Sequence, residues 1–153
     1  MEILNVESKP FTSNPVRANR KALWTGRVLS GLAIAFMAFD AVIKVLRLPV
    51  AVEGTVELGY PPGVVLGLGL LQLSLLVLYL IPRTSVVGAV LWTGYLGGAI
   101  ATHVRLGNPL FSHVLFPIYV AAFFWFGLWL RDRQLRTILP FGNAPQKNRR
   151  LAG

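Results

Sequence analysis

The stretch from Gly63 to Arg105, GVVLGLGLLQLSLLVLYLIPRTSVVGAVLWTGYLGGAIATHVR, decides the fold class of this 153-residue chain. Two long apolar runs in it are separated only by Pro82-Arg83-Thr84, so the two runs are expected to lie side by side in opposite directions. Each run approaches the roughly 20 apolar residues that an α-helix needs to span a bilayer. The stretch therefore predicts a pair of antiparallel membrane helices.

The same apolar character extends on both sides of this stretch. Between Gly59 and Leu130, Arg83 and Arg105 are the only charged residues, and only 14% of the whole chain is charged, against about 25% in a soluble domain. The pattern predicts an all-α membrane protein with four transmembrane helices in an up-down-up-down antiparallel bundle. The expected helices cover about residues 23–46, 62–81, 85–103 and 110–130 of a membrane domain at 23–140. Outside this domain lie a polar N-terminus, 1–22, and a basic C-terminal tail, 141–153, both predicted to be disordered.

The distribution of basic residues predicts the orientation. With four spans, the side of the membrane opposite the termini carries three of the 15 basic residues, Lys44, Arg47 and Arg105, and the side of the termini carries the other 12. Because basic residues stay on the cytoplasmic side, both termini are predicted to be cytoplasmic, in a bacterial cytoplasmic (inner) membrane. The net charge of +9 has no basic patch with interleaved aromatic residues, so nucleic acid is not an expected partner.

The glycines of the apolar segments are predicted to serve helix packing. Membrane helices associate through small residues spaced four apart, which let two backbones approach closely. A phosphate-binding interpretation fails because no strand precedes these glycines. The glycines predicted to lie at helix contacts are Gly31, Gly63, Gly67, Gly94, Gly97 and Gly98.

An ionisable residue inside or beside a membrane span is energetically costly, so it is expected either to pair with another residue or to serve a function. Asp40 and Lys44 are four residues apart, so they can pair on one helix face. Asp40 lies about 20 Å along its helix from Arg27, too deep to belong to the membrane surface. Asp40 is therefore predicted to form the floor of an outward-opening pocket whose mouth carries Glu57, His103 and Arg105.

His113 is a further candidate for this ligand-binding cluster, at the outer end of the fourth segment. Such a cluster suits an acidic or quinone-like head group, or a proton relay. In the alternative interpretation, His103, Arg105 and His113 form only an interfacial rim in contact with head groups and water.

Catalytic and cofactor motifs are not found. No nucleophile motif brings Ser, His and Asp together, so no catalytic residue is assigned. The two histidines with a carboxylate could ligate zinc, but they lack the tight spacing of zinc sites, so no metal site is predicted. The chain has no cysteine and no ligand set for haem, flavin or an iron–sulfur cluster, so no intrinsic cofactor is expected.

One ordered series of short motifs resembles a known family. Residues 81–140 carry Pro-Arg-Thr, Gly-Tyr-Leu-Gly-Gly-Ala, His-x-Arg, and then Leu-Arg-Asp followed by Leu-Arg and Leu-Pro. Together with the Asp40–Lys44 pair and the segment Glu57-Leu58-Gly59-Tyr60-Pro61, this order resembles the DoxX-like family of small four-helix membrane proteins. The resemblance implies the four-helix fold. Some relatives are membrane subunits of thiosulfate:quinone oxidoreductase and others are associated with oxidative-stress complexes, but the family offers no agreed catalytic residues to transfer.

Three functions follow as hypotheses. The leading one is a non-catalytic membrane subunit or binding module for a lipid-soluble small molecule such as a quinone. The second is the membrane subunit of a quinone-linked redox enzyme, in which a soluble or membrane partner protein brings the cofactor. The third is a small-solute transporter, which with four spans and no visible repeat would require a homo-oligomer.

Overall fold

The structure is a computed structural model that describes residues 20–138, and these residues form helices and connections without a strand. The tails predicted to be disordered lie outside the described residues, except that residues 20–22 begin the first helix. The all-helical prediction is confirmed. The elements are α1 (Arg20–Val45), α2 (Pro49–Glu57), α3 (Val64–Leu80), α4 (Ser85–Arg105), the π-helical turn η1 (Leu110–Val114), α5 (Phe116–Arg131) and α6 (Arg133–Ile138).

Three of the helical segments are long and apolar enough to cross a membrane: α1, α4 and the continuous segment Leu110–Arg131. The fourth apolar helix, α3, has 17 residues and is shorter than these. Large apolar side chains point outward along the long helices, as lipid contact requires and as a water-soluble protein avoids. Examples of these exposed side chains are Leu32, Phe39, Leu70, Val87, Val90 and Phe126.

Helix α2 occupies residues that the sequence pattern assigned to a loop. Pro49 occupies the first turn of α2, where its fixed φ and missing N–H are tolerated. Between α1 and α2, Arg47 adopts a left-handed backbone with φ 51°, which turns the chain sharply. The short helix α6 was likewise not predicted.

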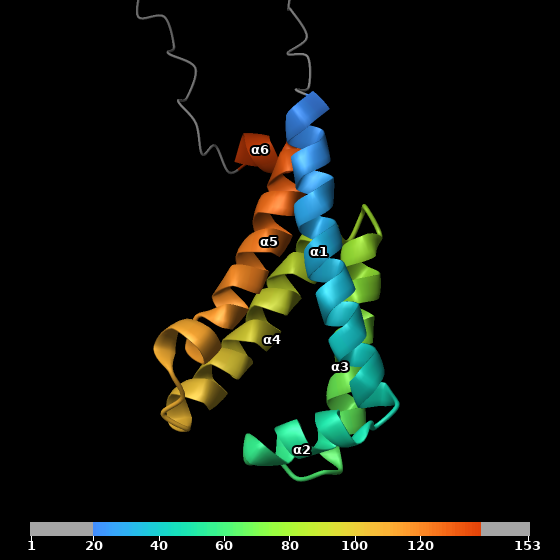
Figure 1. Cartoon of the computed structure of the whole chain (residues 1–153). Helices are drawn as coiled ribbons and strands as arrows, with labels where there is room; N and C mark the ends of the chain where they lie inside the picture. The colour runs from blue at the N-terminus through green and yellow to red at the C-terminus, as the bar shows by residue number, and fades with distance from the viewer. Residues whose placement is uncertain (1–19, 139–153) are drawn as a thin grey trace, which may run out of the picture.

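The four long helices form two arms (Figure 1). Helix α1 packs against α3 and α5, and α4 packs against the same two helices, whereas α1 and α4 have no Cα atoms within 8 Å of each other. In Figure 1 the arm α1–α3 and the arm α4–α5 meet toward the start of α1 and diverge toward α2, which lies across the far end. We call these the closed end and the open end.

An aromatic core holds the two arms together. Tyr79, Trp92 and Phe124 are fully buried, the Phe124 ring stacks on Trp92 with centroids 5.2 Å apart, and it meets Tyr79 edge-on at 4.7 Å. The Tyr79 hydroxyl donates a hydrogen bond of 2.9 Å to the Phe124 carbonyl. Because that bond uses its only proton, the hydroxyl of Ser30, 3.0 Å away, is the donor in their contact. One tyrosine thereby links α1, α3 and α5.

Glycines make the closest helix contacts, but they are not the predicted ones. An added Cβ would lie 2.6 Å from the Tyr79 backbone nitrogen at Gly88, 2.8 Å from the Ser30 nitrogen at Gly127, and 2.8 Å from the Val45 nitrogen at Gly69. None of these three positions tolerates a side chain without movement of backbone atoms. Gly26 is similarly tight, with Leu130 Cβ at 2.8 Å.

Within residues 20–138, none of the six glycines predicted to serve helix packing makes a close helix contact. A Cβ added at any of them would meet no other atom within 4 Å. Four-residue spacing identifies a helix face that a neighbour could approach, but the arms diverge and no neighbour reaches these faces. The six are Gly31, Gly63, Gly67, Gly94, Gly97 and Gly98.

Candidate ligand-binding cavity

A cavity of about 400 Å³ lies between the arms on the side where they diverge. Its walls are mostly apolar, and a few polar side chains from α1, α2, α4 and the α2–α3 connection interrupt them. The apolar side chains that line it include Phe36, Met37, Leu68, Leu96, Phe116 and Val120. The polar ones are Asp40, Lys44, Thr55, Tyr60, Tyr95, Thr102 and His103.

Two of these six glycines contribute to the open volume of the cavity. Gly94 and Gly98 lie one turn apart on α4, and both line the cavity. Since a Cβ at either position would have open space around it, the missing side chains leave volume rather than allow a helix contact. The glycine-rich stretch of α4 therefore shapes a cavity wall.

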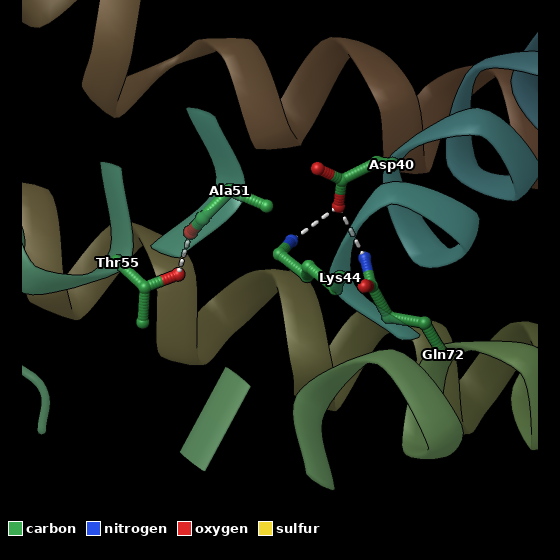
Figure 2. Close-up of polar contacts among 5 residues, drawn as sticks. All are labelled: Asp40, Lys44, Ala51, Thr55 and Gln72. Atoms are coloured by element: carbon green, nitrogen blue, oxygen red, sulfur yellow. Dashed lines mark hydrogen bonds and ion pairs between the residues drawn. The ribbon is translucent and has the colours of Figure 1, made fainter. Parts of the chain in front are cut away.

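The carboxylate of Asp40 anchors the polar side of the cavity (Figure 2). One of its oxygens, Oδ2, accepts hydrogen bonds from Lys44 Nζ and, at 2.6 Å, from Gln72 Nε2. The predicted ion pair between Asp40 and Lys44 is thus confirmed. The two side chains are partly buried, with 28% of Asp40 and 16% of Lys44 exposed.

Gln72 is a residue of this site that the sequence analysis missed. It is completely buried on α3, donates to Asp40, and leaves its own Oε1 without a hydrogen-bond partner in residues 20–138. A buried amide is costly in an apolar helix unless it is paired. The lone amide in the run VVLGLGLLQLSLLVLYL was the available signal, because such a residue needs a polar partner from a neighbouring helix.

Two hydrogen bonds tie the α2–α3 connection to the end of α4. The Arg105 guanidinium donates to the Leu58 carbonyl at 2.9 Å. Thr102 donates its hydroxyl proton to the Gly98 carbonyl, so the Tyr60 hydroxyl is the donor in its 2.7 Å contact with Thr102. We call this pair of bonds the latch. Since Tyr60 and Leu58 line the cavity, the latch closes one of its borders.

The two histidines meet at the end of α4. The side-chain amide of Asn108 donates to His103 Nδ1 at 2.8 Å, which leaves Nε2 as the protonated nitrogen of a neutral ring. The His103 and His113 rings contact edge-on with centroids 5.6 Å apart, and His113 also contacts the Ser112 hydroxyl at 2.8 Å. Only His103 of the two lines the cavity.

The six predicted ligand-binding residues therefore separate into two groups. Asp40, Lys44 and His103 come together around one cavity. Glu57 is exposed on α2, Arg105 belongs to the latch and His113 packs on His103, so none of these three lines the cavity. Within residues 20–138, no three His, Asp or Glu side chains lie close enough to hold a metal ion.

One of the comparisons with known proteins gives a match, to a family model. Neither curated proteins nor solved structures yield a match to the chain. The model of the DoxX-like family matches residues 28–127, from the first third of α1 to late in α5. This match covers the Asp40 cluster, the latch and the cavity. With most of its length matched and with three apolar helices long enough to span a bilayer, the chain is a membrane protein that belongs to the DoxX-like family.

Proposed function

We propose that this protein binds a lipid-soluble small molecule, such as a quinone, in the cavity between its two arms, and that it acts as a non-catalytic membrane subunit or binding module. The single observation that carries the proposal is the cavity itself, with apolar walls and one anchored polar cluster. Its volume of about 400 Å³ falls in the range of known ligand sites, about 300–1,000 Å³. Side chains such as Phe36 and Phe116 offer apolar contact to a ring, while Asp40 and Tyr95 offer polar contact to its substituents.

We propose further that all four long helices cross the bacterial inner membrane, in up-down-up-down order, with both termini in the cytoplasm. The 17 residues of α3 reach the lower limit of about 17 residues for a membrane helix. Lys21, Arg27 and Arg83 belong to the closed end, which the positive-inside rule assigns to the cytoplasm. The cavity then lies toward the outer leaflet.

Reporter fusions test this orientation. Fusions at residues 1 and 153 are expected to report a cytoplasmic location, and a fusion within α2 an external one, because the basic residues concentrate at the closed end. External reporters at both termini would contradict the orientation, and an external C-terminal reporter with a cytoplasmic N-terminal one would contradict the assignment of α3 as a span.

The binding proposal is tested by analysing what co-purifies with the protein. Gly98→Leu places a side chain in the cavity, and Gly97→Leu is the matched control, since the neighbouring position is also free of contacts but does not line the cavity. Mass spectrometry of extracts in mild detergent is expected to find a lipid-soluble compound with the wild type and with Gly97→Leu, and much less with Gly98→Leu. Equal recovery from all three proteins would contradict the proposal.

The same preparation addresses the redox alternative. A quinone-linked enzyme complex would retain a partner protein whose flavin, haem or iron–sulfur cluster absorbs visible light. A colourless preparation that carries the small molecule supports the binding module, and a coloured one with a stoichiometric second protein supports the redox complex.

A further inference from the structure

We infer that the cavity selects a neutral ligand whose head group carries a hydroxyl, which donates a hydrogen bond to Asp40. This inference rests on the proposed function and specifies the chemistry of its ligand. A hydroquinone or a lipid alcohol carries such a group. A quinone, with two carbonyl oxygens and no O–H, does not.

The first step concerns the free oxygen of Asp40. Both protein donors, Lys44 and Gln72, bind Oδ2, and Figure 2 shows the other carboxylate oxygen turned away from them. No group in residues 20–138 donates a hydrogen bond to that second oxygen. Because Asp40 lines the cavity and more than a quarter of its side chain is exposed, this oxygen is available to a ligand.

The second step concerns charge. Among residues 20–138, Asp40 and Lys44 are the only Asp, Glu, Lys or Arg residues that line the cavity, and they neutralise each other. A charged head group would enter a mostly apolar space with no opposite charge left for it, at a large desolvation cost. The cavity therefore favours a neutral head group.

The third step concerns hydrogen-bond direction. A carboxylate that already binds a lysine accepts hydrogen bonds and has none to donate, so its ligand must be a donor. A carbonyl placed against it would leave two acceptors facing each other, each without the partner it had in water. A hydroxyl proton satisfies the free oxygen of Asp40.

The fourth step concerns the ligand's own oxygen. Tyr95 lines the same cavity, and its hydroxyl makes no hydrogen bond with any residue in 20–138. It can donate to the oxygen of the ligand while that oxygen donates to Asp40. Asp40 and Tyr95 thus offer an acceptor and a donor in the same cavity, the two kinds of partner that a hydroxyl group needs.

Redox-inert probes test the inference on the purified, full-length protein. Binding of 4-hexylphenol, of its methyl ether 4-hexylanisole and of 1-fluoro-4-hexylbenzene can be measured by calorimetry in detergent. The phenol is expected to bind at least about ten-fold more tightly than either analogue, the effect of one hydrogen bond to a charged group. The fluoro compound matches the hydroxyl in size, so tight binding of that compound would show that crowding by the methyl group, and not a missing proton, sets the preference, and would overturn the inference.

Two variants test which residue produces the preference for the phenol over its methyl ether. Asp40→Asn is expected to bring the ratio of phenol to anisole affinity close to one, because an amide can turn its NH₂ group toward an ether oxygen. Tyr95→Phe leaves the ion pair intact and is expected to weaken the phenol and the ether alike, with the ratio preserved. A ratio that persists in a folded Asp40→Asn protein would overturn the role of Asp40, and a ratio lost in Tyr95→Phe would do the same.

The outcomes separate this inference from the proposed function. Equal binding of all three aromatic probes would overturn the hydroxyl requirement and still support a lipid-soluble ligand. Failure of every probe to bind, with no compound co-purifying, would overturn the proposed function. Binding of decylhydroquinone and of decanol then distinguishes the two kinds of hydroxyl-bearing ligand. The inference holds if either compound binds. Tighter binding of decylhydroquinone indicates a quinol, and tighter binding of decanol indicates a lipid alcohol.

Discussion

The two ends of this small bundle use the same four helices for opposite purposes. At the closed end, Gly88 and Gly127 bring backbones into direct contact, and Tyr79 joins three helices through buried hydrogen bonds. At the open end, Gly94 and Gly98 face empty space, and polar side chains line a cavity. Glycine thus has two roles in one membrane helix. Where a neighbouring helix lies close, it permits backbone contact, and where no helix lies close, it leaves open volume. Stability is expected to reside at the closed end and binding at the open end.

The difference between the two ends can be tested by introducing leucine at two glycines of α4, one at each end. Gly88→Leu is expected to prevent folding, because even its Cβ would overlap the backbone of Tyr79. Gly98→Leu, ten residues along the same helix, is expected to leave the melting temperature in detergent nearly unchanged, since its side chain enters the cavity. Size-exclusion profiles and melting curves report both results. Similar melting temperatures for the two variants would remove the distinction between the ends.

The ion pair is the part of the open end expected to affect stability most. Asp40→Leu leaves Lys44 without its partner in a partly buried position and should lower the free energy of unfolding by about 2 kcal/mol. The double variant Asp40→Leu/Lys44→Met removes both charges and should recover the part of that loss that comes from the unpaired lysine, while the buried Gln72 amide still lacks its acceptor. Denaturation in mixed micelles measures the two losses, and a double variant no more stable than the single one would show that the unpaired lysine is not the cause of the loss.

A tyrosine at each end allows a direct measurement of the difference. Tyr79→Phe removes buried hydrogen bonds to Ser30 and Phe124 and should cost about 1–2 kcal/mol. Tyr60→Phe removes the contact with Thr102 at an exposed position and should cost less, about 0.5 kcal/mol. The same denaturation experiment ranks the two. A larger loss for Tyr60→Phe would place the stabilising contacts at the open end instead.

The smallest effect on stability is expected at the other bond of the latch, from Arg105 to the Leu58 carbonyl, where access to the cavity rather than folding should change. The chain has no cysteine, so Ala99→Cys provides a single thiol in the wall of the cavity. In this background, Arg105→Gln removes the bond to Leu58 and should accelerate reaction with a water-soluble maleimide several-fold. Arg47→Gln, at the same end but outside the cavity lining, is the control and should not alter the rate. Equal rates in all three proteins would show that the latch does not limit access.

The fold was predictable where composition and periodicity carried the information. Four apolar segments, their approximate bounds and the short turn at Pro82 follow from the sequence, because the bilayer penalises charge over a known length. Helix α2 was not predicted, because a proline can follow the end of one helix or begin the next, and Pro49 begins α2.

The site was predictable only in part, for a physical reason. Asp40 and Lys44 could be paired because both lie on one helix, and His103 could be placed by its depth. Gln72 and Tyr95 reach the site from other helices, so their participation depends on how the arms are rotated and how far they diverge. The prediction that the glycines lie at helix contacts depended on the same unknown distance between helices, because spacing along one helix does not specify how far away the next helix lies.

The absence of side chains at Gly94 and Gly98 has a consequence for how such a protein can change over generations. Single substitutions to alanine, serine or valine at either position would alter the volume and polarity of the cavity wall without touching the contacts of the closed end. A change of one methyl group in an apolar site shifts ligand discrimination by about 1–3 kcal/mol. Under the proposed function, changes at these two codons are expected to retune the preferred molecule while the scaffold that folds the chain stays the same.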